Sequence, residues 1–587
     1  MTTNSRIAPN PGSLRRTQTA LTPLTVLAAL TGLLATAPAL HAAIFYVGSE
    51  PECDTTTING AVVGAAFTLN EDDEIRLTED QTNVNRELRN FDPDTIGTIT
   101  ISGNWSSCVD RAARGLPPAT RISGNGSDPV FEVVADGAES VVTFDQLEII
   151  GSADGVGIAS GRGVTIVGPA EVSFLASRIL DFQGGLEIEG GAEVLLDGDT
   201  IIAGNVGLPG AGLLCHGSTV RSAANIADNA TASSGGGVFL DSGCVFHLLS
   251  GAQVRYNQAG WGGGFAIGAG ARLEPESSDP IFSAFVFGNV AQNEGGGLYV
   301  VNGGYAEIEN TWVRDNSAGE RGGGVFVDVD STFFMSRNGP SCIRDQGCSR
   351  LSGNSITTAG GNREGTALYV GGGSTAGLFT THVEGNDAID DVGTVLVASG
   401  ATTQLSLEGV ALSGNRTESL FDARSGAEVL VAYTSAADNG FDTEGSAAAA
   451  GGRAWNGTLE IYSSALWGHG AFDATGGGTI YADCLVAQTT TGITTLDEHT
   501  VGIDPLFVDP GATNLRLAAH SVAVDYCDVA NYVPLFRDLD DQPRGWDAPT
   551  VPDDLGDYDV GAYELFGLLF GDGFESGDPS AWSATTP

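Results

Sequence analysis

The stretch NSAGERGGGVFV at residues 316–327 joins an asparagine to three consecutive glycines and a short β-branched and aromatic run. The phrase recurs along the chain, and after most copies the apolar segment is again led by glycine, as at residues 235, 262 and 295. A hydrophobic-x-x-Asn motif precedes each copy, in steps of 24, 28, 32, 27, 38, 32 and 29 residues. It ends at Asn205, Asn229, Asn257, Asn289, Asn316, Asn354, Asn386 and Asn415.

The spacing and the apolar pattern of this repeat select an architecture. Apolar residues alternate over three to six positions, as in VFVDV at 325–329, and glycine interrupts each run. That is the periodicity of strands rather than of helices. Propeller blades need roughly 40–45 residues. One coil of a parallel β-helix, with three short strands and three turns, fits the observed steps.

A stacked coil also gives the asparagines and glycines a role. Each turn would lie about 4.8 Å above the turn below it. We expect each asparagine to adopt the left-handed αL conformation at a bend and to pass side-chain amide hydrogen bonds along the column. The glycines would allow positive φ and close approach of neighbouring backbones. The eight asparagines are therefore predicted to form a structural ladder.

Residues 150–440 resemble the Asn and Gly-Gly repeat of the polymorphic outer-membrane protein family, and right-handed parallel β-helix proteins more widely. The resemblance implies an all-β, right-handed, pectate-lyase-like parallel β-helix with an N-terminal cap and an irregular C-terminal region. CDTTTINGAVVGAA at 53–66 is similar to the capping helix of such proteins. Thr55 or Thr56 would cap that helix, with Ile58, Ala61, Val62 and Ala65 on one face.

The C-terminal sequence has a different character. DPLF at 504–507 and DVGAYE at 559–564 resemble the C-terminal portion of secreted bacterial β-helix proteins of the choice-of-anchor type, where such phrases close the solenoid. We divide the chain into a signal peptide (1–42), an N-terminal cap and entry region (43–125), β-helix coils (126–500), a C-terminal closing region (501–565) and a tail (566–587).

The N-terminal segment predicts export. Arg15 and Arg16 precede an apolar run at 20–40, and Ala42 supplies a small residue before the expected cleavage site. Pro23 and Pro38 shorten the apolar core below the length of a membrane span. No later segment has the apolar length of a transmembrane helix. We expect a bacterial protein that is secreted or displayed on the cell surface.

Eight cysteines in an exported chain indicate disulfides. Connectivity cannot be deduced from the sequence, but proximity suggests pairs. A zinc site is not expected, because the chain has no C-x-x-C pair. The suggested pairs are Cys53 with Cys108, Cys215 with Cys244, Cys342 with Cys348 and Cys484 with Cys527.

The net charge of −47 argues against a nucleic-acid partner, which would need a basic surface. Calcium is the one candidate cofactor, through EDDE at 71–74, RDLDDQPRG at 537–545 or DDLGDYD at 553–559. Surface turns are the expected structure of the first two segments, and DDLGDYD lacks the spacing of an EF-hand loop.

The search for catalytic residues gives no assembled set. GHG at 468–470 lacks the paired aspartates that accompany it in polygalacturonase-like hydrolases. A lyase would need an acidic column and a base such as Arg314. Asp228 and Asp315 precede ladder asparagines, but Tyr256 and Gly288 interrupt that column. We predict no catalytic residue, and the candidates for stacking on sugar rings are Trp261, Trp312 and Trp467.

These observations favour an exported, non-enzymatic scaffold that binds at a surface or in the extracellular medium, in the manner of an adhesin. A long solenoid offers a wide repetitive face for glycans or cell-surface components. We expect it to act as a monomer. The alternative is a polysaccharide lyase or glycoside hydrolase acting on extracellular glycans, which three or more carboxylates gathered with an arginine in one lateral groove would favour.

Overall fold

The computed structural model describes part of the compact unit that spans Ala42–Pro587. The expected signal peptide, the Cys342–Cys348 segment and residues 567–587 of the tail lie outside the described residues. The described ranges are 43–65, 72–84, 98–109, 119–124, 126, 129–135, 140–151, 158–276, 283–338, 349–358, 364–388, 393–440, 449–497, 499–528, 532–547 and 556–566.

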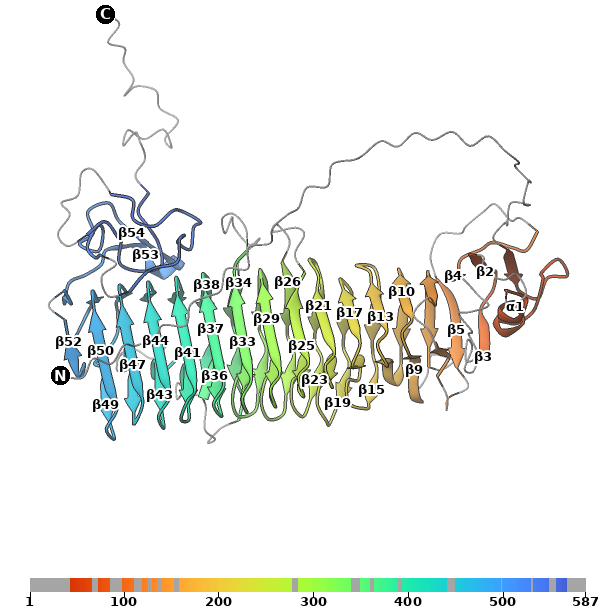
Figure 1. Cartoon of the computed structure of the whole chain (residues 1–587), viewed down its shortest axis with the longest axis horizontal. Helices are drawn as coiled ribbons and strands as arrows, with labels where there is room; N and C mark the ends of the chain where they lie inside the picture. The colour runs from red at the N-terminus through yellow and green to blue at the C-terminus, as the bar shows by residue number, and fades with distance from the viewer. Residues whose placement is uncertain are drawn as a thin grey trace, which may run out of the picture. The chain divides into compact units, whose positions relative to one another are not determined.

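The described residues form a right-handed parallel β-helix, as expected (Figure 1). Each regular coil contributes one strand to each of three long parallel sheets, which we number 1 to 3 in chain order. A short fourth sheet lies between sheets 2 and 3 in seven coils. The stack buries a continuous apolar core; in sheet 1, for example, Val220, Phe246 and Leu273 follow one another at equivalent positions, all fully buried.

The strands have the following bounds. Sheet 1 contains β1 (Ile44–Val47), β2 (Asp73–Leu77), β4 (Thr98–Ser102), β7 (Val141–Asp145), β10 (Glu171–Leu175), β13 (Glu193–Leu196), β17 (Thr219–Ser222), β21 (Val245–Leu248), β25 (Arg272–Pro275), β29 (Tyr305–Glu309), β33 (Thr332–Ser336), β37 (Thr375–Phe379), β41 (Gln404–Glu408), β44 (Glu428–Ala432), β47 (Thr458–Tyr462), β50 (Thr479–Asp483) and β52 (Thr495–Leu496). Sheet 2 contains β3 (Gln81–Val84), β5 (Thr120–Gly124), β8 (Leu147–Ile150), β11 (Arg178–Leu180), β14 (Ile201–Ala203), β18 (Asn225–Ala227), β22 (Gln253–Arg255), β26 (Ala284–Phe287), β30 (Thr311–Arg314), β34 (Ser349–Ser352), β38 (Thr381–Glu384), β42 (Ala411–Ser413), β45 (Ser435–Ala437), β48 (Ala465–Leu466) and β51 (Val486–Ala487).

Sheet 3 contains β6 (Phe131–Val134), β9 (Ala159–Val167), β12 (Phe182–Glu189), β16 (Leu213–His216), β20 (Val238–Asp241), β24 (Phe265–Ile267), β28 (Leu298–Val300), β32 (Val325–Val327), β36 (Glu364–Gly371), β40 (Thr394–Ser399), β43 (Ser419–Arg424), β46 (Arg453–Trp455) and β49 (Asp473–Thr475). The fourth sheet contains β15 (Val206–Gly207), β19 (Ala230–Thr231), β23 (Gln258–Ala259), β27 (Val290–Ala291), β31 (Ser317–Ala318), β35 (Ser355–Ile356) and β39 (Asp387–Ala388).

A short helix covers the N-terminal end of the stack. Helix α1 (Ile58–Ala65) buries the four predicted apolar residues and lies against β1 and β2 (Figure 1). Its cap differs from the prediction, because the Thr57 hydroxyl, rather than that of Thr55 or Thr56, accepts a hydrogen bond from the Gly60 amide at 3.1 Å. In the part of the chain that the structure describes, no helix is long and apolar enough to cross a membrane.

The repeated asparagines line one buried column between sheet 2 and the fourth sheet. Each donates from Nδ2 to Oδ1 of the asparagine one coil further on, at 2.7–3.1 Å. The same Oδ1 also accepts the backbone N–H of the preceding asparagine. Asn439, which we did not predict, is the ninth member, and its step of 24 residues from Asn415 repeats the first step of the series.

The left-handed conformation lies one residue earlier than we expected. The residues that precede the ladder asparagines have positive φ, for example 56° at Asp228, 65° at Gly288 and 54° at Asp438, whereas none of the ladder asparagines does. The preceding residue makes the bend, and the asparagine backbone then keeps its N–H and side chain aligned with the column. The prediction that asparagine itself adopts αL was therefore wrong.

The third glycine of each triplet makes room for the ladder. A Cβ atom added to Gly237 would lie 2.9 Å from Nδ2 of Asn257, and one added to Gly264 would lie 3.1 Å from Nδ2 of Asn289. The first glycine, Gly235, has a φ of 70° and starts the turn into sheet 3. The valine that follows, Val238, is fully buried. The asparagine and the triplet therefore interlock across neighbouring coils.

The C-terminal closing region (501–565) lies along one side of the last coils, and we call it the flank (Figure 1). Here β53 (Phe507–Asp509) and β54 (Asn514–Leu517) pair antiparallel around a 3₁₀ turn, η2 (Pro510–Ala512). The flank contacts coils from Arg337, which donates to the Leu539 carbonyl at 2.7 Å, onward to Ser463, whose carbonyl accepts the Gly561 amide. Residues 489–494 lie against the end of the core, where the Thr491 carbonyl accepts the Phe472 amide at 2.8 Å.

Candidate functional site

The Gly-His-Gly motif occupies a rung of the asparagine column. In sheet 2, Ala436 pairs with Leu466, so His469 takes the position that follows Asn439. Its Nε2 lies 3.4 Å from the Ala436 carbonyl, as Nδ2 of Asn439 bonds the equivalent Leu412 carbonyl one coil earlier. Burial lowers the pKa of His469 to about 4. A neutral, buried histidine inside the column has no access to a substrate.

Three of the four suggested cysteine pairs are disulfides in the structure. Cys53–Cys108 joins the start of the stack to the segment after β4, and Cys484–Cys527 joins the last coils to the flank. Cys215–Cys244 links consecutive coils at sheet 3. Cys342 and Cys348 lie outside the described residues. These bonds make the sulfur atoms unsuitable as metal ligands.

The column that contains Asp228 and Asp315 is a set of left-handed bends and carries no acidic stripe. Tyr256 and Gly288, the intervening members, also have positive φ. Arg314 is engaged: its guanidinium pairs with Asp315 at 2.7 Å and lies 4.8 Å from the centroid of the Phe287 ring. The geometry gives Arg314 no role as a base.

The carboxylates of RDLDDQPRG are held by the chain itself. Asp538 accepts the backbone amides of Gln542 and Glu564, at 2.6 and 2.8 Å. Asp540 pairs with Arg516 at 2.5 Å, and Asp541 pairs with Arg337 at 3.1 Å. These partners supply the charge compensation that a calcium ion would otherwise supply.

The other two acidic segments contain three carboxylates that are engaged within the chain. In EDDE, Asp73 accepts the Ala43 amide and Glu74 pairs with Arg76 at 2.7 Å. In DDLGDYD, the buried Asp559 accepts the Asp525 amide at 2.9 Å. Residues 71 and 553–555 lie outside the described part. Asp73, Glu74 and Asp559 thus serve the fold.

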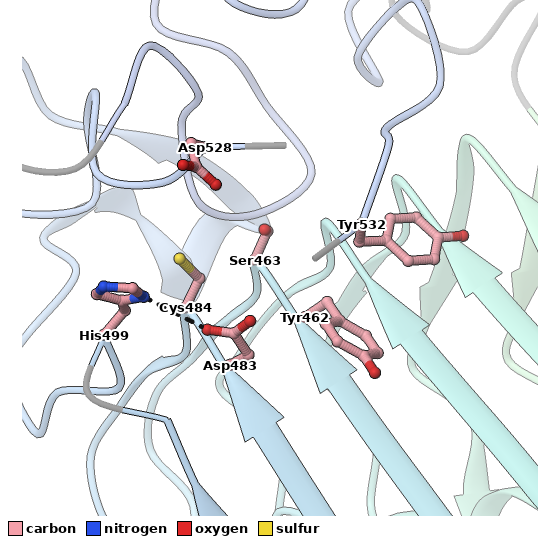
Figure 2. Close-up of a pocket in the computed structure, with 7 residues that line it drawn as sticks. All are labelled: Tyr462, Ser463, Asp483, Cys484, His499, Asp528 and Tyr532. Atoms are coloured by element: carbon pink, nitrogen blue, oxygen red, sulfur yellow. Dashed lines mark ion pairs between the residues drawn. The ribbon is translucent and has the colours of Figure 1, made fainter. Parts of the chain in front are cut away.

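A small enclosed pocket lies between the last coils and the flank (Figure 2). Its walls include Asp483 at the end of β50, and His499, whose Nδ1 lies 3.6 Å from Asp483 Oδ1 and 2.9 Å from Asp497 Oδ1. The Tyr532 ring stacks on that of Tyr462 at 5.6 Å. A volume of about 70 Å³ suits a few water molecules and excludes a sugar ring. The pocket therefore joins the flank to the stack and is too small to hold a polysaccharide.

Two carboxylates and an arginine meet on the outer side of sheet 3. Arg424 bonds both Glu364 and Asp422. The Asp422 residue is only 1% exposed, which keeps a polymer away from its carboxylate. Such an arrangement reinforces sheet 3 and lacks the access that a glycosidase acid or base needs.

The outer side of sheet 2 carries a group of rings and guanidinium groups that sequence reasoning found only in part. It draws its members from β22, β26, β30 and β34, where Phe285, Trp312 and Arg350 follow one another in register. Trp312 was identified from the sequence, but its neighbours arrive from coils about 30 residues apart. We call it the arginine–aromatic face: Arg255, Tyr256, Phe285, Phe287, Trp312, Arg314 and Arg350.

The members of this face hold one another in place. The Phe285 and Trp312 rings meet edge to face at 5.5 Å, as do the rings of Tyr256 and Phe287 at 5.2 Å. The Arg350 guanidinium lies 5.0 Å from the centroid of Trp312. Tyr256 is 48% exposed, and its ring lies 2.6 Å from where a Cβ of Gly288 would be. The result is a pre-positioned surface of rings edged by cationic donors.

Of the other two predicted tryptophans, neither joins this face. Trp261 lies beside Ser234 at the edge of sheet 3, and Trp467 packs against the flank near Phe507. The fold defines the chain as a parallel β-helix repeat protein. By sequence, no protein-family model matches it, and no curated protein matches it either.

Proposed function

We propose that this protein is an exported, non-enzymatic scaffold that binds glycans or other components of a cell surface through its arginine–aromatic face. Three features support the proposal: the repeat builds a long rigid surface, the face gathers rings and donors on one side, and most carboxylates of the candidate calcium segments that are described bond to groups of the chain itself. Exposed rings stack on the C–H faces of sugars, and fixed arginines donate hydrogen bonds to their oxygens.

The observation that carries the proposal is the conformation of Tyr256. A bulky residue with a φ of 55° is strained, and aspartate or glycine fills most equivalent positions of the column. This conformation costs of the order of 1–3 kcal/mol, and the ring lies across Gly288 with about half of its surface open to solvent. Stability alone does not favour this choice of residue.

The test is a glycan-array screen of the exported protein, followed by affinity measurement on the best ligand. Tyr256→Ala should weaken binding about tenfold, the effect of losing roughly 1.4 kcal/mol of stacking. Trp455→Ala removes another exposed ring, from β46 of sheet 3, and should leave binding unchanged.

Two outcomes would contradict the proposal. One is the absence of any glycan or cell-surface ligand for the wild-type protein. The other is rapid turnover of an acidic polysaccharide, with or without calcium, which would establish the lyase or hydrolase alternative.

A further inference from the structure

A groove of about 650 Å³ lies between the coils and the flank, and it shares no lining residue with the arginine–aromatic face or with the pocket of Figure 2. One wall comes from the ends of β33 and β37, and the other from residues 535–541 of the flank. Its volume falls in the range of small-molecule sites in proteins. Its lining includes Arg337, Phe379, Leu535, Phe536, Arg537 and Asp541.

The two walls are fixed to each other. Arg337 is buried and donates to the Leu539 and Asp538 carbonyls at 2.7 and 3.3 Å, besides its ion pair with Asp541. Further along, the Tyr532 hydroxyl donates to Glu408 at 3.1 Å. A ligand therefore meets a preformed groove and does not have to order it, which lowers the cost of binding.

An exposed aromatic ring stands in the groove. Phe536 is 79% exposed, and Phe379 and Leu535 add apolar surface to the lining. A phenylalanine this open gains little from burial in the folded chain. Ser336, Asn338 and Thr380 place polar groups around the rings. The open ring can stack on the C–H face of a sugar, and the polar groups around it can bond to the sugar's hydroxyl groups.

The groove also contains a cationic side chain, Arg537, on a strongly acidic protein. The Arg537 guanidinium lies 5.8 Å from the centroid of the Phe536 ring. Among the described residues its hydrogen-bond and ion-pair partner is Asp541, through the carbonyl at 2.5 Å and the carboxylate at 3.5 Å. The side chain is 48% exposed, so its outer edge faces solvent. A carboxylate placed there would form charge-assisted bonds with a guanidinium set beside a ring.

We propose that this groove binds a carboxylate-bearing sugar residue, with the sugar ring on Phe536 and its carboxylate on Arg537. The proposal rests on the proposed function in one respect, namely that the protein meets extracellular glycans. It assigns a second site with its own ligand class, distinct from the arginine–aromatic face.

The experiment titrates the full exported chain with a hyaluronan tetrasaccharide, which carries glucuronate, and with chitotetraose, which is neutral, by calorimetry. We expect the hyaluronan tetrasaccharide to bind more tightly than chitotetraose, and salt to weaken its binding. Phe536→Ala and Arg537→Gln should each weaken it about tenfold. Val533→Ala changes an equally exposed apolar residue, 76% exposed and outside the groove lining, and should have no effect.

The outcomes separate the two proposals. Equal affinity for both oligosaccharides, no measurable binding of either, or indifference to Arg537→Gln would overturn the inference. If Tyr256→Ala loses binding and Phe536→Ala does not, the ligand lies on the arginine–aromatic face. That result would contradict the groove proposal and support the proposed function. Binding at the groove, without any effect of Tyr256→Ala on array ligands, would support the groove as a binding site and contradict the role of the arginine–aromatic face.

Discussion

At the scale of single residues, His469 shows how a catalytic motif and a structural rung can look alike. Its two flanking glycines reproduce the composition of a hydrolase motif, and the sequence argues against a catalytic histidine only because the paired aspartates are missing. Register explains the rest: the Nε2–carbonyl contact replaces the bond that asparagine Nδ2 makes in other coils. Among the described residues, Nδ1 of His469 has no hydrogen-bond partner.

His469→Asn should extend the ladder and flatten the pH dependence of stability. Because the folded-state pKa, about 4, lies below the ordinary value of 6.5, the unfolded chain binds the proton first as pH falls. The contribution of His469 to stability is therefore lost as pH falls from 6.5 to 4, by roughly 3 kcal/mol. Denaturant melts at several pH values would measure the loss, and an equal loss in His469→Asn would refute the assignment.

The eight predicted asparagines could be found from sequence because each ends a recognisable phrase at a regular step. Asn439 was missed because the apolar member of its phrase is Ala436, although the step of 24 residues was a usable signal. The position of αL was not predictable from residue preference, since asparagine, aspartate and glycine all tolerate it. The hydrogen bonds of the asparagine column determine which residue takes the left-handed conformation, the asparagine or the residue before it.

At the scale of the element, each turn into sheet 3 depends on a side chain from the next coil. Gly264 illustrates this, because its missing Cβ leaves space for Asn289 and for the Gly297 carbonyl. Glycine thus recurs in the sequence because stacked coils leave no room for a side chain at these positions. The strands and the length of each coil could therefore be predicted from the repeat. The arginine–aromatic face could not, because its members come from separate coils and their pairing depends on register.

Gly264→Ala should destabilise the protein by more than about 2 kcal/mol. The new methyl would contact backbone oxygen at 2.6 Å and the ladder amide at 3.1 Å, and neither can withdraw without breaking hydrogen bonds. Gly198→Ala is the matched control: its φ is not left-handed and the nearest atom is 4.0 Å away, so it should be neutral or slightly stabilising. Similar melting temperatures for the two variants would contradict the interlock.

At the scale of the whole molecule, the DVGAYE phrase and the end of the RDLDDQPRG segment meet in one buried polar cluster. Glu564 accepts the Gly545 and Trp546 amides at 2.8 and 2.9 Å, and Arg544 lies 3.8 Å from its other oxygen. The Arg544 guanidinium also lies 4.5 Å from the centroid of Tyr433 in the coils. The sequence identified the phrases, but their convergence spans positions far apart and depends on how the flank folds back.

Attachment of the flank should weaken as pH rises. Burial, with the nearby negative charge of Asp559, raises the pKa of Glu564 to about 8. The folded form then holds a proton that the unfolded chain releases near pH 4.5, so its stabilisation is lost between pH 4.5 and 8. Hydrogen-exchange protection of residues 532–547 and 556–566 should fall over this range in the wild type and fall less in Glu564→Gln, where Asp559, whose pKa burial raises to about 6, still contributes. An identical decline in Glu564→Gln would refute it, and the exposed Glu320→Gln should behave as the wild type.

The Cys215–Cys244 bond has a mechanical consequence. A tensile load on the two termini would peel coils from the ends, one after another, because each coil is held only by its neighbours. Peeling cannot straighten the 29-residue loop that this bond closes, since its ends are covalently joined. Under oxidising conditions the closed loop therefore limits how far the chain can extend. In an anchored molecule under tension, this loop would not lengthen even after the surrounding coils had unfolded.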